Sequence, residues 1–255
     1  MVYEFFLTLG VNSMNDALER LKDAISSSDN IVFFGGAGVS TESGIPDFRS
    51  ADGIYNMKYP YPPETILSHS FFIKNTSDFY NFYRDKMLHP NAMPNKAHYA
   101  LVELETRGKL KAIVTQNVDG LHHKAGSINV LELHGSRSRY YCMKCGKVFG
   151  MDVVFEAKDV PLCSCGGTIR PDVVLFEEAL DQNVIEKSVQ AIRNADVLIV
   201  GGTSLNVYPA AGLIQYYDGN MLILINKSET SYDRHANIVI RESIGETLDA
   251  AIQDL

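Results

Sequence analysis

Four closely spaced cysteines are the residues of this 255-residue sequence that point most directly to a chemical role. They form the pair Cys142-x2-Cys145 and, further along, the pair Cys163-x-Cys165. Four thiolates suit a tetrahedral zinc ion and leave no coordination position open for water. A single disulfide or a redox-active CxxC would leave half of the cluster unexplained. We therefore predict one structural zinc ion held by these cysteines.

A glycine-rich loop, residues 35–44, follows a short apolar run at residues 31–34. Glycines let the backbone approach a ligand closely, and a helix after the loop would aim free N–H groups at phosphate. The common dinucleotide pattern GxGxxG fails, however, because Thr41 stands where the third glycine belongs. On spacing alone, the loop indicates a nucleotide site about as strongly as it indicates an ordinary strand-to-helix turn.

Apolar runs alternate with helical stretches along the chain, and this pattern predicts the frame that positions these residues. Because strands and helices alternate, we predict a Rossmann-like, doubly wound parallel sheet, with ligands bound beyond the carboxyl ends of its strands. Ser243 and Glu246 have capping-box spacing before the last helix. The expected strands are 31–34, 111–115, 196–200, 221–226 and 237–240, and the expected helices include 15–27, 95–107 and 181–194.

Two segments interrupt this alternation and are predicted to be insertions. Residues 50–94 are rich in proline and aromatic residues, and residues 137–170 contain every cysteine. We predict that residues 1–49, 95–136 and 171–255 form the Rossmann-like domain, that 50–94 form a cofactor loop and a helical insertion, and that 137–170 form the zinc-binding insertion. Met14 precedes a good helix start, so residues 1–13 are expected to be an extension outside the core.

The overall charge and hydropathy restrict the class of partner. Asp and Glu outnumber Lys and Arg by 31 to 23, which gives a formal charge of −8. A negative surface repels phosphate backbones, so direct nucleic-acid binding is not expected, whereas a lysine-rich protein segment would be tolerated. No apolar run reaches the roughly 20 residues of a membrane helix, and the opening residues do not resemble a signal peptide. We expect a cytoplasmic protein without a membrane partner.

Three sequence blocks carry a family resemblance: GAGVSTESGIPDFR at 36–49, TQNVDGLH at 115–122 and LHG at 133–135. In this order and at these spacings they resemble the sirtuin family of NAD-dependent protein lysine deacylases, in its bacterial form. The segments GTSL at 202–205, VYPAA at 207–211 and IN at 225–226 extend the resemblance to most of the chain. The resemblance implies that acyl-lysine and NAD give lysine, nicotinamide and O-acyl-ADP-ribose, with NAD consumed as a co-substrate.

The resemblance also implies which residues bind NAD. Ala37 and Thr41 would line the phosphate and ribose path, while Phe48 and Arg49 would cover the nicotinamide ribose on a loop that moves during turnover. Amide and carboxylate side chains suit the carboxamide and the ribose hydroxyls. The full set of implied cofactor-binding residues is Gly36, Ala37, Gly38, Thr41, Asp47, Phe48, Arg49, Gln116, Asn117, Val118, Asp119, His134, Gly202, Thr203, Ser204, Asn226 and Ile244.

His134 is the implied general base, with Asn117 and Asp119 as the other catalytic residues. An imidazole with an ordinary pKa near 6.5 accepts a proton at neutral pH without heavy tuning. By resemblance, His134 would deprotonate a ribose hydroxyl after the acyl oxygen of the substrate has attacked the anomeric carbon. His122 also lies in a family block, and we expect it to have a structural role.

The segment 170–178 resembles the strand with which family members bind an acylated-lysine peptide, main chain to main chain. Val174 would offer its carbonyl to the acylated lysine N–H, and Phe176 and Val207 would be further substrate contacts. Many family members have FGE where this chain has Phe176-Glu177-Glu178, and the loss of the glycine adds charge and stiffness beside the peptide groove. Between Arg49 and Arg84 there is no arginine to pair with an acidic acyl group, so neutral acyl chains are expected.

Three other functions fit parts of the pattern. A protein ADP-ribosyltransferase would use much of the same pocket with a different acceptor. An NAD-dependent dehydrogenase is disfavoured by the failed GxGxxG pattern and by the set of Asn117, Asp119 and His134. A non-enzymatic zinc module that binds nucleic acid or protein is disfavoured by the −8 charge and by the complete set of family motifs.

Overall fold

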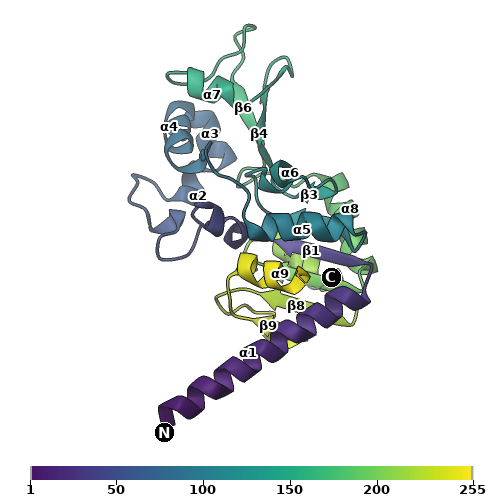
Figure 1. Cartoon of the computed structure of the whole chain (residues 1–255). Coiled ribbons are helices and arrows are strands. Elements are labelled where there is room, and N and C mark those ends of the chain that lie inside the picture. Colours follow the sequence, from purple (N-terminus) through teal and green to yellow (C-terminus); the bar gives the residue numbers. More distant parts are fainter. Residues whose placement is uncertain (1, 254) are drawn as a thin grey trace.

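A six-stranded parallel sheet forms the main body of the computed structural model, which describes residues 2–253 and 255, with side chains from residue 15 onward. Its strand order is β3-β2-β1-β7-β8-β9, which is the doubly wound order of Rossmann-type domains. The predicted Rossmann-like fold is therefore confirmed (Figure 1). The strands are β1 Ile31–Gly35, β2 Leu110–Thr115, β3 Val130–Glu132, β7 Val197–Gly201, β8 Met221–Ile225 and β9 Ile238–Ile240.

Successive residues of each central strand point to opposite faces of the sheet, and helices cover both faces. Ile31 and Phe33 of β1 pack with α1, α5 and α9 on one face, whereas Val32 and Phe34 pack with α8 and a 3-10 helix on the other. All four side chains are fully buried. The helices are α1 Val2–Ser27, α5 Lys96–Thr106, α6 Leu121–Ala125, α8 Gln182–Asn194, α9 Ile244–Ile252 and the 3-10 helix Ala210–Tyr216.

The five predicted strands agree with the structure to within one residue at either end, and β3 is an additional strand. Ser243 does precede α9, but its side chain makes no capping hydrogen bond, so the predicted capping box is wrong. Glu42 takes that role, because its Oε1 accepts the N–H of Gly245 at 2.9 Å. The first helix begins at Val2, so the predicted start at residue 15 is wrong. Whether residues 1–13 lie outside the core, as expected, depends on side chains outside the described part of the chain. Within residues 2–253, no helix is long and apolar enough to cross a membrane.

A second, smaller unit is built from two chain segments, 50–94 and 135–173, and we call it the small unit. The second segment forms the antiparallel sheet β5-β4-β6. Figure 1 shows α2, α3, α4 and α7 gathered with β4 and β6 at one end of the molecule. The bounds are α2 Pro63–Ile66, α3 His69–Lys74, α4 Thr76–Phe82, a π-helical turn Tyr83–Met87, β4 Gly135–Cys142, β5 Val148–Phe149, α7 Asp152–Glu156 and β6 Ile169–Val173.

The two segments of the small unit share one aromatic core. Phe72 and Phe79 meet edge to face, with ring centroids 4.8 Å apart, and they belong to the same buried cluster as Tyr140 of β4 and Ile169 of β6. Tyr80 also donates its hydroxyl hydrogen to the carbonyl of Ile169. Because aromatic side chains bury large areas, this shared core holds the helical insertion against the cysteine-bearing sheet.

Candidate active site

The predicted site residues follow the carboxyl ends of strands, and in a parallel sheet these ends lie at one edge. The loop 36–49 follows β1, residues 116–119 follow β2, and residues 202–205 follow β7. His134 lies two residues beyond β3, and Asn226 comes directly after β8. The order of strands thus gathers residues that are far apart in sequence along the edge where doubly wound sheets bind ligands.

The loops after β1 and β7 touch each other through their backbones. Gly36 and Gly38 donate their N–H groups to the carbonyls of Gly201 and Gly202, at 3.1 and 2.7 Å. A Cβ atom added to Gly38 would lie 2.8 Å from the Cα of Gly202, so only glycine fits there. The glycines predicted to bind the cofactor therefore have a structural requirement of their own, which is the close approach of the two loops.

Two 3-10 turns, Ala37–Val39 and Thr41–Ser43, follow the glycine-rich loop in place of the expected helix. Asn95, at the start of α5, donates from Nδ2 to the carbonyl of Val39 at 2.8 Å and to Oγ of Ser43 at 2.9 Å. A continuous α-helix would need the Val39 carbonyl to accept the N–H of Ser43, which instead donates to the carbonyl of Ser40 at 3.0 Å, as in a 3-10 turn.

A buried serine, Ser40, joins the loop after β1 to the catalytic residues predicted after β2. Its hydroxyl donates to Oδ2 of Asp119 at 2.7 Å and accepts from Nδ2 of Asn117 at 3.2 Å. The other carboxylate oxygen of Asp119 accepts the N–H of Leu121 at 2.8 Å. Asp119 and Asn117 are therefore fixed in position, since each has a specific partner.

Gln116 and Thr203 connect the ends of β2 and β7. Nε2 of Gln116 donates to Oγ1 of Thr203 at 3.0 Å, and the same oxygen accepts the N–H of Leu205 at 3.2 Å. Together with the Ser40 contacts, these bonds join three of the loops that the sequence assigned to NAD. The carbonyl of Val118 accepts the N–H of Arg137 at 2.8 Å, so the backbone of that loop is also held.

His134 has a geometry that suits a general base. Its Nδ1 lies 2.9 Å from the carbonyl oxygen of Gln116. A carbonyl only accepts hydrogen bonds, so Nδ1 carries the proton in the neutral ring and Nε2 is the basic nitrogen. Burial lowers the pKa of His134, although the hydrogen bond to Gln116 acts in the opposite direction. The neutral ring is therefore the form present at physiological pH.

Gly135 allows the strand after His134 to pair with the predicted substrate segment. It has φ +74° and lies opposite Val173 in the antiparallel ladder of β4 and β6. The N–H of Val174 then donates to the carbonyl of His134 at 3.0 Å. Within the described part of the chain, the Val174 carbonyl accepts no hydrogen bond and so matches the predicted acceptor for a substrate lysine.

The predicted cofactor loop folds onto one tyrosine. Oδ1 of Asp47 accepts the N–H groups of Arg49 and Ser50 at 2.9 and 2.7 Å. Phe48 meets the ring of Tyr55 edge to face with centroids 5.6 Å apart, and the Arg49 guanidinium lies 5.2 Å from the centroid of the same ring. Partial burial raises the pKa of Tyr55 to about 12, so its ring remains a neutral phenol.

The remaining predicted site residues make only local hydrogen bonds or none to the other site loops. The hydroxyl of Thr41 donates to the carbonyl of Gly38 at 2.9 Å, and Nδ2 of Asn226 donates to the carbonyl of Ser228 at 2.8 Å. Ile244, the first residue of α9, is buried in the core. Ser204 and Val207 lie partly exposed in the loop after β7, while Phe176 is exposed beside the small unit.

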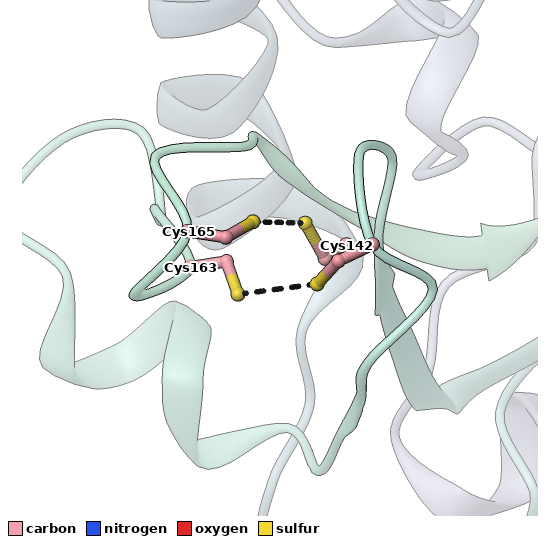
Figure 2. Close-up of side chains that lie close together, drawn as sticks. Cys142, Cys163 and Cys165 are labelled. Carbon is pink, nitrogen blue, oxygen red and sulfur yellow. Dashed lines mark hydrogen bonds between the residues drawn. The ribbon is translucent and has the colours of Figure 1, made fainter.

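The four cysteines come together at the end of β4, and Figure 2 labels three of them, Cys142, Cys163 and Cys165. The Sγ atoms of Cys142 and Cys165 are 3.5 Å apart, and those of Cys145 and Cys163 are 3.7 Å apart. All four sulfur atoms lie within 4.8 Å of one another. A tetrahedral zinc ion with bonds of about 2.3 Å needs sulfur separations of about 3.8 Å, so the set fits the predicted ion.

Ser40 is the site residue that reasoning from the sequence missed. The sequence presents it only as the serine of the block GAGVS, followed by the polar residues Thr41, Glu42 and Ser43, and nothing in this local run sets it apart from them. Its importance follows from a contact with Asp119, which lies 79 positions further along the chain. Family membership would have been the signal, since the serine is part of the most diagnostic block.

The fold and the site together define a Rossmann-type enzyme class in which a cysteine-bearing small unit stands over the nucleotide edge. The model described as the Sir2 family matches residues 36–209, and the chain belongs to this family.

Individual relatives and structures agree with this assignment. The NAD-dependent protein deacetylase of Clostridium acetobutylicum is 59% identical over 241 residues, which cover 93% of this chain and 98% of the relative. A Sir2 enzyme structure has a TM-score of 0.86 at 37% identity and covers 94% of this chain and 98% of its own. A Sir2 complex with a p53 peptide and NAD+ has a TM-score of 0.81 at 38% identity, with 91% and 95% covered.

Proposed function

We propose that this protein is an NAD-dependent protein lysine deacetylase that converts acyl-lysine and NAD into lysine, nicotinamide and O-acyl-ADP-ribose. One observation carries the proposal. His134 accepts the N–H of Val174 through its own carbonyl, and its Nδ1 is held by the carbonyl of Gln116. The proposed general base is thereby tied both to the segment expected to bind peptide and to the loop expected to bind NAD. The named activity of relatives such as the Clostridium acetobutylicum protein supports the same reading.

The proposed roles follow the contacts at the strand edge. NAD supplies an anomeric carbon from which nicotinamide leaves. Asn117 and Asp119, held by Ser40, orient the carboxamide and the ribose, and Nε2 of His134 takes a proton from a ribose hydroxyl. Gln116 and Thr203 sit between the two halves of the cofactor path. Arg49 and Phe48 close over the nicotinamide ribose from the loop after β1.

The remaining parts of the proposal concern the partners and the organisation of the chain. The residues implied by family resemblance bind NAD, and Val174, Phe176 and Val207 contact an acylated-lysine peptide that carries a neutral acyl group. The Rossmann-like domain comprises 1–49, 95–136 and 171–255, with 50–94 and 137–170 as insertions. The four cysteines hold zinc, whose role is to order the end of the small unit. The protein acts in the cytoplasm on protein substrates.

The test is product analysis by mass spectrometry. The zinc-loaded protein is incubated with NAD and an acetyl-lysine peptide, beside His134→Ala. Nicotinamide and O-acetyl-ADP-ribose formed by the unaltered protein alone would support both the reaction and the base. A peptide or protein that gains the mass of ADP-ribose would point to the transferase alternative. Failure to consume NAD with acetyl and longer neutral acyl peptides would refute the proposal.

A further inference from the structure

Glu178, at the end of the proposed substrate segment, has more polar partners than other carboxylates near the site. Both of its oxygens accept from the guanidinium of Arg170, at 2.8 and 2.9 Å. Oε2 also accepts the N–H of Leu175 at 2.9 Å, and Oε1 lies 2.8 Å from Nδ1 of His69. Arg170 is only 7% exposed, so the bidentate pair is largely removed from water.

These contacts fix the backbone of residues 173–175. Arg170 donates from Nη2 to the carbonyl of Val173 at 3.0 Å, while Glu178 takes the N–H of Leu175. The carbonyl of Val174 lies between these two bonded groups, and it accepts no hydrogen bond from any described residue. The pair therefore holds both neighbours of the one carbonyl that is proposed to meet the substrate lysine.

The same pair links the substrate segment to the helical insertion. His69 begins α3, and its own N–H donates to the carbonyl of Phe176 at 2.9 Å. Phe176 in turn donates its N–H to the carbonyl of Leu67 at 3.0 Å. The edge of the segment toward the insertion is thus occupied by protein. Glu178 and Arg170, together with His69 and Val174, line a cavity of about 600 Å³.

We infer that the Arg170–Glu178 pair, with His69, is a positioning device that presents the Val174 carbonyl to the acylated peptide. This inference rests on the proposed function and adds residues to it. Partial burial alone would raise the pKa of Glu178, but hydrogen bonds from Arg170, Leu175 and His69 outweigh it and lower the pKa to about 2. The carboxylate is therefore charged throughout the working pH range, and a fixed charge is what a bidentate clamp requires.

The test compares Glu178→Gln with His69→Ala. We expect Glu178→Gln to raise the KM for an acetyl-lysine peptide about tenfold, the size of one lost charge-assisted hydrogen bond, while the KM for NAD stays within about twofold. His69→Ala removes one of the hydrogen-bond partners of Glu178. Because the His69 ring is exposed, we expect the fold to stay intact and the KM for the peptide to rise only about threefold. The matched control is Glu103→Gln, which breaks an exposed Arg–Glu pair on α5 far from the site and should leave both constants unchanged.

A second readout does not depend on activity. Amide hydrogen exchange followed by mass spectrometry should show faster exchange across residues 173–178 in both site variants, with residues 113–119 unchanged. Unaltered peptide KM in both variants, or equal rises in the KM for peptide and for NAD, would overturn the inference. If Glu178→Gln does not fold, His69→Ala decides. If the unaltered protein shows no deacylation, the proposed function fails, and the exchange experiment still decides whether the pair holds the segment.

Discussion

Replacing Gly135 with alanine tests whether the junction between the sheet edge and the small unit is rigid. Gly135 has φ +74°, which costs an alanine about 1 kcal/mol. An added Cβ would also overlap the carbonyl oxygen of Asp172 and lie 3.1 Å from its carbonyl carbon. Both atoms belong to the backbone of β6, so relief requires the strands to separate, and overpacking of this kind costs about 2 kcal/mol more.

The matched control is Gly108→Ala. Gly108 has φ +73°, but an added Cβ would meet nothing within 4 Å, so this variant carries the backbone cost without the clash. In a chain of this size about 1 kcal/mol lowers Tm by about 3 °C, so we expect a fall of about 3 °C for Gly108→Ala and about 9 °C for Gly135→Ala. Thermal unfolding by circular dichroism measures both values.

The activity of the same variants completes the test. Gly135 follows His134 directly and pairs with Val173. At temperatures well below its Tm, Gly135→Ala should therefore also show a lower turnover, whereas Gly108→Ala should keep the turnover of the unaltered protein. Equal Tm values for the two variants, within about 1 °C, would show that β4 and β6 separate easily, and the argument for a rigid junction would then be refuted.

Four further predictions follow from the contacts at the strand ends and at the cysteine cluster. His134→Ala should lower kcat by about 10²- to 10⁴-fold. Because burial lowers the pKa of His134, the unaltered enzyme should lose kcat/KM on acidification only below the ordinary histidine value near 6.5, and a pH–rate profile with an acidic limb above that value would contradict the assignment. Removal of zinc with a chelator should unfold the end of the small unit, which would be seen as faster amide exchange in residues 142–168. Cys142→Ser should have the same effect without a chelator. Unchanged exchange in both experiments would argue against a structural ion. Ser40→Ala leaves Asp119 and Asn117 without their shared partner, so we expect kcat/KM for NAD to fall about tenfold or more while Tm changes by only a few degrees, and an unchanged NAD constant would exclude the positioning role.

The parallel sheet could be predicted from sequence because its strands are buried on both faces. A run such as residues 31–34 is apolar at every position, and such runs stand out against the helices between them. β3 lacks this signal, since it has only three residues and all of them are partly exposed. β4 mixes arginine and serine with tyrosine: Ser138 and Arg139 are exposed, whereas the equally polar Ser136 and Arg137 are buried, so polarity does not mark its buried face.

The position of the site could be predicted because its residues follow the ends of strands. The contacts between these residues could not be predicted from the sequence. The turns after β1 depend on Asn95, which lies about 50 positions beyond them and reaches back to Val39 and Ser43. At the N-terminus of α9, the free N–H of Gly245 is bonded by Glu42. Ser243, the cap residue of the predicted capping box, makes no such bond. In both places the deciding contact comes from a side chain that is distant in sequence, and only the folded chain brings it into reach.

The shared aromatic core of the small unit has a consequence for protein engineering. Tyr140, Cys142 and Ile169 of the cysteine-bearing sheet belong to the core shared with the helical insertion, whereas Met143 and Leu162, in the loops beyond the strands, are exposed. Residues between 143 and 168 can therefore be exchanged for those of a relative, provided that the cysteines and the core positions are kept. A graft that replaces the whole sheet, by contrast, must bring its own helical insertion with it.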